Sequence, residues 1–253
     1  MAWLTYDITA DSEALDDYCD RVVVVTESMA NREDSNFRVP GVEGEFSYPD
    51  KLWEAGNVIM ETFLKYTDQN GDVTHEDGAA GHVYENLSHL RRIFSKNGLV
   101  DLRRTAPDYG QTSMLVEAIQ GPRDGSFPAH KIWVLKAPKP FWKGLTPVTL
   151  TSTTTDHTPA GDAPIDDMVV TFGGDGKVTI GSEWIEISGS SGSGIVVDVG
   201  KRTILQSGVP RDRWFFTYSD RWLRLQGGVE SDITFEGSVT SLVYSPAWHG
   251  GGG

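Results

Sequence analysis

The sequence predicts a mainly β protein in two β-rich parts, of which the first carries one α-helix and the second is an antiparallel β-sandwich. Short runs of β-branched and aromatic residues, bounded by turn residues, recur along the 253-residue chain. A clear helical stripe of apolar residues occurs in the first half. A polar, turn-rich passage at 146–163 then interrupts the pattern. We therefore predict a first domain over 1–145, a linker over 146–163, a sandwich over 164–249 and a flexible tail over 250–253.

The first half contains several strands. RVVVVTE (21–27) is a short β-branched run, which predicts a strand buried on both faces. NVIMETFLKYT (57–67) alternates between apolar and mixed positions, which predicts a strand with one wetter face. Three further strands are expected at 99–105, 113–121 and 130–138.

The helix is predicted over about 79–97. Its apolar residues fall on one stripe at spacings of four, three and four: Val83, Leu87, Leu90 and Phe94. Asn97-Gly98 ends it. His82 and His89 lie seven residues apart on this helix, and no carboxylate or cysteine partner is recognised at ligand spacing. Both are predicted to be ordinary helix residues.

The stretch KYTDQNGDVTHEDG (65–78) raises the question of a calcium loop. Asp68, Asn70 and Asp72 occupy the first three liganding places of an EF-hand. Val73 stands where the loop needs glycine, and Ala79 stands where it needs a bidentate carboxylate. The stretch is therefore predicted to be a turn that binds no calcium of consequence.

In the second half, strands alternate with turns at short spacing, as in a sandwich. GGDGKV (173–178) lacks the Gly-Lys-Ser/Thr ending of a phosphate loop, so it is predicted to be a hairpin turn. SGSSGSGI (188–195) links strands with no following helix, which argues against a nucleophilic serine. Glu183 and Glu186 would face opposite sides of a strand, so they cannot act as a glycosidase pair.

Composition excludes several classes of function. The net charge of −14 disfavours binding to nucleic acid, and no apolar run reaches the roughly 20 residues that a membrane helix needs. The N-terminus does not resemble a secretory signal, and a single cysteine, Cys19, fits assembly in a reducing cytoplasm. The six histidines are scattered along the sequence. We predict no catalytic residues, no metal, no cofactor and no enzymatic activity.

Aromatic residues leave one alternative open. A β-sandwich with exposed aromatics can bind sugar by stacking, although half-buried strands also use aromatics for packing. The candidates for such a surface are Trp214, Phe216, Trp222 and Trp248. The alternative function is therefore a non-catalytic carbohydrate-binding module.

The order of the pieces resembles the distal tail protein family of long-tailed (siphovirus-type) bacteriophages. In the second half the similar segments are APIDDMVVTFGGDGKVTI, GIVVDVGKRTIL and RWFFTYSDRWLRLQGG, before a closing SPAWH. In the first half a Val39-Pro40-Gly41 turn leads to a strand, an acidic turn and the helix ENLSHLRRIF. The resemblance covers almost the whole chain.

The resemblance implies a β-barrel-like first domain with one helix, which closes into a homohexameric ring, and a galectin-like second domain. It implies a structural virion protein at the tail tip or baseplate, made in the host cytoplasm. Its partners would be further copies of itself, the tail tube protein, the tail-tip hub protein and receptor-binding or side-fibre proteins. The long polar stretch at 28–56 would either supply one ring contact or fold back on its own barrel. The candidate contact residues are Phe37, Val39, Phe46, Tyr48 and Trp53.

Overall fold

The computed structural model describes residues 7–27, 36–37, 46–47, 56–96, 98–106, 110–139, 141–190, 193–211, 216–219 and 221–249. Contacts divide the chain into two compact units. The first comprises Met1–Arg32, Trp53–Trp142 and Gly250–Gly253, and the second comprises Glu33–Leu52 and Lys143–His249. Within the described ranges, no helix is long and apolar enough to cross a membrane.

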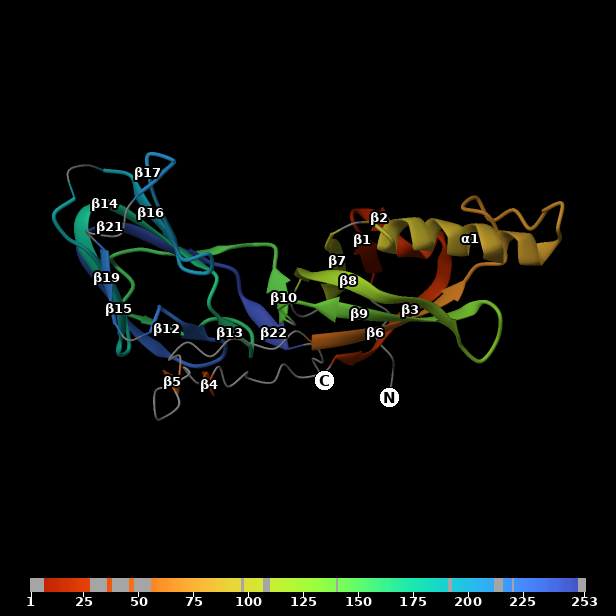
Figure 1. Ribbon diagram of the computed structural model, residues 1–253, viewed down its shortest axis with the longest axis horizontal. Coiled ribbons are helices and arrows are strands. Elements are labelled where there is room, and N and C mark those ends of the chain that lie inside the picture. Colours follow the sequence, from red (N-terminus) through yellow and green to blue (C-terminus); the bar gives the residue numbers. More distant parts are fainter. Residues whose placement is uncertain are drawn as a thin grey trace. The chain divides into compact units, whose positions relative to one another are not determined.

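The first unit is a curled antiparallel sheet with one helix, α1 (Ala79–Phe94) (Figure 1). The strand order is β2-β1-β7-β8-β9-β6-β3, and neighbouring strands are antiparallel. The strands are β1 (Asp7–Ala10), β2 (Glu13–Ala14), β3 (Cys19–Glu27), β6 (Gly56–Leu64), β7 (Val100–Ala106), β8 (Gly110–Asp124) and β9 (His130–Ala137). The predicted barrel-like half with one helix is confirmed as a curled half-barrel.

Strand β6 shows the predicted alternation. One face is buried, at Val58, Met60, Thr62 and Leu64, and the residues between them are half-buried or exposed. The buried hydroxyl of Thr62 accepts a hydrogen bond from Nε1 of Trp133 on β9 at 2.9 Å. A polar atom inside the core is thereby paired, as burial requires.

Helix α1 packs its predicted stripe against the sheet. Val83, Leu87, Leu90 and Phe94 are each 5 % exposed or less, and burial of one such side chain stabilises the fold by about 1.5–3 kcal/mol. The ring of Phe94 lies 5.0 Å from that of Trp133, centroid to centroid. The helix ends at Phe94, before the predicted 97, because Ser95 is its C-cap and donates its amide to the carbonyl of Arg91.

Strand β3 corrects one expectation. It pairs only with β6 among the described strands and lies at the end of the strand order. Arg21 is exposed and Val22 and Val23 are half-buried. The predicted burial on both faces is therefore wrong for residues 21–23, where β3 has no second neighbour among the described strands.

The second unit contains an antiparallel sheet of order β11-β21-β14-β16-β17-β18, in which β15 pairs with β14 and β19. The chain enters this unit within β10 (Phe141–Gly144). The other strands are β4 (Asn36–Phe37), β5 (Phe46–Ser47), β11 (Val148–Leu150), β12 (Asp156–His157), β13 (Pro164–Ile165), β14 (Met168–Ile180), β15 (Glu183–Ile187), β16 (Ile195–Asp198), β17 (Thr203–Gln206), β18 (Val209–Pro210), β19 (Phe216–Tyr218), β20 (Leu225–Gln226), β21 (Ser231–Tyr244) and β22 (Ala247–His249). Two smaller pairs are β4–β5 and β13–β20.

The glycine-rich stretch 173–176 is not a hairpin turn. Strand β14 runs through it without a break, and its pairing with β21 shifts register between Phe172 and Gly176. The turn lies instead at Gly181, whose φ is 55°, between β14 and β15. The glycines that were predicted to form a turn therefore lie in a bulged part of the β14–β21 pairing. Glycine is common both in turns and in bulges, so the sequence pattern alone does not distinguish the two.

The predicted linker contains sheet structure. Within 146–163, β11 and β12 both pair with β21. The division of the chain by contacts falls earlier, between Trp142 and Lys143. The limits given above for the two domains, 1–145 and 164–249, stay predictions.

Gly161 lies where three segments of the second unit meet. It forms a parallel bridge with Ala247 at the start of β22, and the carbonyl of Ala247 accepts the amides of Asp162 and Ala163, each at 3.2 Å. The third segment joins because the amide of Gly227 donates to the carbonyl of Ala163 at 3.1 Å. A Cβ on Gly161 would lie 2.0 Å from the Ala247 carbonyl oxygen, so only glycine fits.

A half-buried histidine on β12 should make the second unit sensitive to acid. Nε2 of His157 lies 2.5 Å from the Tyr244 hydroxyl, and burial lowers the pKa of His157 below its usual 6.5. The unfolded chain then binds more protons below about pH 6.5, so stability should fall as the pH drops from 7 to 5. Urea titrations between pH 7 and pH 5 should show this loss of unfolding free energy. His157→Gln should make the unfolding free energy depend less steeply on pH. An unchanged slope in His157→Gln would contradict this assignment.

Candidate functional site

The residues considered for catalysis remain apart. Alternation along β15 directs Glu183 and Glu186 to opposite faces of the strand, as predicted. The described part of the serine-rich loop is held by Asp175, whose carboxylate accepts the amides of Gly189 and Ser190, each at 2.9 Å, and the Ser190 hydroxyl at 2.6 Å. These hydrogen bonds lower the pKa of Asp175, with the Ser190 hydroxyl as the largest cause. The loop is thus ordered as a turn at its first residues.

The aromatic residues proposed for sugar stacking are largely buried. Phe216, Trp222 and Trp248 are 6 %, 4 % and 9 % exposed, and Trp214 lies outside the described residues. Phe216 and Trp222 pack on each other and on Tyr218, with ring centroids 5.1–5.7 Å apart. A buried ring cannot offer its face to a sugar, so these three residues form core structure.

Two of the five predicted ring-contact residues, Phe37 and Phe46, lie on strands β4 and β5. Phe37 and Phe46 are paired positions of this two-stranded sheet. The side chains of these two residues, and the whole of Val39, Tyr48 and Trp53, lie outside what the structure describes. Their role in a contact stays a prediction.

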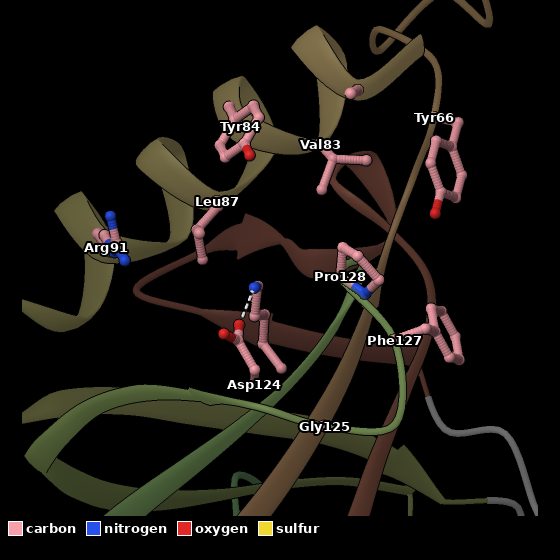
Figure 2. A pocket seen from close by; sticks show the side chains of 11 residues that line it. Tyr66, Val83, Tyr84, Leu87, Arg91, Asp124, Gly125, Phe127 and Pro128 are labelled. Atoms are coloured by element: carbon pink, nitrogen blue, oxygen red, sulfur yellow. Dashed lines mark hydrogen bonds and ion pairs between the residues drawn. The ribbon is translucent and has the colours of Figure 1, made fainter.

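A hollow of about 630 Å³ lies beside α1 in the first unit, where residues from Ala80 to Arg91 line it (Figure 2). Its apolar wall is Val83 and Leu87 of α1, both 5 % exposed. Three aromatic side chains stand around its mouth: Tyr66 after β6, Tyr84 on α1 and Phe127 in the β8–β9 loop. They are 45 %, 72 % and 44 % exposed, and exposed apolar groups gathered in one patch often mark an interaction site.

The loop that carries Phe127 is held by His130. The amide of Ser126 donates to Nδ1 of His130 at 3.0 Å, and Nε2 of the same ring lies 3.1 Å from a carboxylate oxygen of Glu61. Phe63 stacks on this imidazole, with centroids 4.5 Å apart. Gly125 leaves the space that the ring fills, since a Cβ there would lie 2.1 Å from Nδ1. These contacts fix the position of Phe127 beside the hollow.

The charged side of the hollow is formed by Arg91 and by an ion pair between Lys131 and Asp124, drawn dashed in Figure 2. Lys131 donates to the Asp124 carboxylate and so lowers the pKa of Asp124. An apolar floor with aromatic residues at the mouth and one charged edge suits the side chains of a protein segment. No nucleophile with an adjacent general base lines it among the described residues.

Sequence reasoning missed this hollow. Tyr84 lies off the apolar stripe of α1, and an aromatic residue on the polar face of a predicted helix was an available signal. Phe127 follows a turn signal, Asp124-Gly125, with no periodic pattern around it. The hollow gathers residues from three places along the chain, so no local pattern predicts it.

Comparisons with known proteins bear on the fold. No protein-family model matches the sequence, and no curated protein matches it. Among solved structures, the crystal structure of the Dit (gp 19.1) protein of phage SPP1 matches with a TM-score of 0.63. The match covers 96 % of this chain and 99 % of the SPP1 chain, at 12 % sequence identity.

The chain has the fold of a phage distal tail protein. The SPP1 protein is described as a paradigm of the hub adsorption apparatus in phages that infect Gram-positive bacteria. The distal tail protein fold extends over both units, because the matched region spans nearly the whole of each chain. The resemblance predicted from the order of sequence segments is confirmed at the level of fold.

Proposed function

We propose that this protein is a structural component of a phage tail tip: a ring adaptor that joins the distal end of the tail tube to the hub and to receptor-binding parts. The observation that carries the proposal is the shared fold along 96 % of this chain and 99 % of the SPP1 protein. A match of that extent includes both units and leaves no large part of either chain without a counterpart.

The first unit supports the proposal through its surface. Its hollow presents three exposed aromatic residues around an apolar floor, a composition that protein contacts favour. The carbohydrate-binding alternative has less support, because three of its four aromatic residues are buried. A closed ring also requires two complementary patches on each subunit. We assign one of them to the 28–56 stretch with Phe37, Val39, Phe46, Tyr48 and Trp53.

The ring is tested by the mass of the assembly. Purified protein, alone or with its tube or hub partner, should form closed rings of about six copies. Light scattering and negative-stain images measure this directly. A strict monomer at high concentration, with and without both partners, would contradict the proposal.

Substitution in the 28–56 stretch tests the assigned patch. Phe46→Ser with Trp53→Ser should shift the assembly toward monomer while the circular dichroism spectrum stays that of folded protein. The matched control is Val73→Ser with Leu115→Ser, two apolar residues of the first unit that are 66 % and 51 % exposed. If Phe46→Ser with Trp53→Ser instead abolishes folded protein, these residues belong to the core of their own chain and the assignment fails.

A further inference from the structure

Three potential metal ligands lie together where the loop after β6 meets α1. His75 is in the loop, and His82 and Glu85 are three residues apart on the helix, so they share one face of it. One ligand atom from each residue lies within 4.8 Å of the others. The expectation from sequence that His82 has no carboxylate partner at ligand spacing is therefore wrong, since Glu85 is that partner.

His82 is the unusual member of the cluster. It is 4 % exposed, and neither of its ring nitrogens has a hydrogen-bond partner. A buried polar group without a partner is costly, so such groups are rare in native structures. A carboxylate oxygen of Glu85 lies 3.6 Å from Nδ1 of His82. His89, farther along the helix, lies outside the cluster and stacks on Tyr18 with centroids 5.2 Å apart.

The sequence also positions His75. Its imidazole lies edge-on to that of His82, with centroids 4.8 Å apart, and its Nε2 is 3.3 Å from the other oxygen of Glu85. Gly81 makes this placement possible, because a Cβ on residue 81 would lie 2.0 Å from Nδ1 of His75. A glycine inside a helix costs about 1 kcal/mol relative to alanine, so its presence here fits a packing requirement.

The distances suit a tetrahedral metal ion. Bonds of about 2.0–2.1 Å to nitrogen and oxygen set neighbouring ligand atoms roughly 3.3 Å apart. The separations of 3.3 Å and 3.6 Å are close to this value but end on different oxygens of Glu85. One ligand atom from each residue lies within 4.8 Å of the others, so small side-chain rotations must bring the three together around an ion. We propose that His75, His82 and Glu85 bind one divalent transition-metal ion of the zinc type, with solvent in the fourth position.

The chemistry of the ligands selects the ion. Two imidazoles and one carboxylate favour zinc and its neighbours over calcium, which takes oxygen ligands. The loop carboxylate of Asp68 is used differently: it accepts the amides of Asn70 at 2.9 Å and Asp72 at 2.7 Å. Asp68 thus stabilises the turn of the loop. That the loop binds no calcium stays a prediction. Glu85, with a side chain 58 % exposed, leaves the ion a path to solvent.

Binding would also rearrange the outer contacts of His75. Nδ1 of His75 accepts the amide of Asp77 at 3.0 Å. Ligation through Nε2 moves the ring proton to Nδ1, and the Asp77 carboxylate lies 4.0 Å from that atom as an acceptor. A carboxylate behind a ligating histidine is the usual outer partner of such a site. The ion would fasten the 65–78 loop to α1.

The test is titration of the full-length protein, free of any affinity tag, with Co²⁺ and Zn²⁺. We expect one ion per chain, with the strong visible absorption of four-coordinate Co²⁺ and calorimetric binding of Zn²⁺. Glu85→Gln and His75→Gln should each weaken binding by about 10-fold or more. Glu76→Gln, a nearby exposed carboxylate, and His89→Gln, a histidine outside the cluster, are the matched controls and should bind as the parent does.

A variant that removes no ligand provides the sharpest check. Gly81→Ala places a methyl group on the His75 ring position while favouring the helix, so it should weaken Zn²⁺ binding as His75→Gln does. Zn²⁺ should raise the thermal midpoint of the parent and the controls but not that of Glu85→Gln. No stoichiometric binding, or binding that Glu85→Gln and Gly81→Ala leave unchanged, would overturn the site.

Discussion

Trp133→Ala should lower the free energy of unfolding of the first unit by about 3–5 kcal/mol. Trp133 is 1 % exposed and lies between the sheet and Phe94 of α1. Its removal opens a cavity at the helix–sheet contact and deprives the buried Thr62 hydroxyl of its donor. Both losses act on the same core, so they should appear in one unfolding transition.

Urea titration followed by far-ultraviolet circular dichroism measures this loss without relying on tryptophan emission. Trp133→Phe separates the two contributions, because it keeps most of the volume while removing the N–H donor; a loss of about 1 kcal/mol is expected for the hydrogen bond. Trp184→Ala, at a half-buried residue of the second unit, is the control for loss of a tryptophan. If Trp133→Ala costs no more than Trp184→Ala, the helix does not depend on this contact.

Gly161→Ala should destabilise the second unit by about 4 kcal/mol or more, a size reached only by a few mechanisms. Two of them coincide at this position. The φ of Gly161 is 105°, which alanine rarely adopts, and the added Cβ would lie 2.0 Å from the carbonyl oxygen of Ala247. Relief requires β22 to move away, which breaks the hydrogen bonds of Asp162 and Ala163 to the same carbonyl.

Gly208→Ala is the matched control. Its φ is 79°, but nothing lies within 4 Å of the added Cβ. It should therefore show the backbone strain alone, about 1–2 kcal/mol. Denaturant titrations of both variants give the difference directly. If both variants lose the same unfolding free energy, β22 can move at little cost, and the contact of the three segments at Gly161 is not rigid.

Local patterns in the sequence predicted local structure well. The stripe from Val83 to Phe94 and the alternation of β6 are each determined by neighbours a few residues away, and both are confirmed. Features set by distant partners were harder to predict. The burial of β3 depends on its place at the end of the sheet, and the run through Gly173–Gly176 depends on pairing with β21.

The candidate sites, too, combine features set by neighbouring residues with features set by distant ones. The hollow draws Tyr66, Tyr84 and Phe127 from separate elements, and their meeting depends on the fold. The histidine cluster was partly visible, because Glu85 lies one turn from His82 in the sequence. His75 joins them only through the path of a loop and through the missing side chain of Gly81.

The strand order in the first unit has a consequence for synthesis of the chain. Strand β1 pairs with β7, so Ile8 can pair only after Arg104 has been synthesised. Strand β6 likewise gains its second neighbour only when β9 is present. In the second unit Val148 of β11 pairs with Tyr244 of β21, near the end of the sequence. Such distant pairings fold slowly, over roughly milliseconds to seconds, and leave open strand edges meanwhile. Neither sheet can therefore form on a nascent chain until its later strand has left the ribosome, which is β9 for the first unit and β21 for the second.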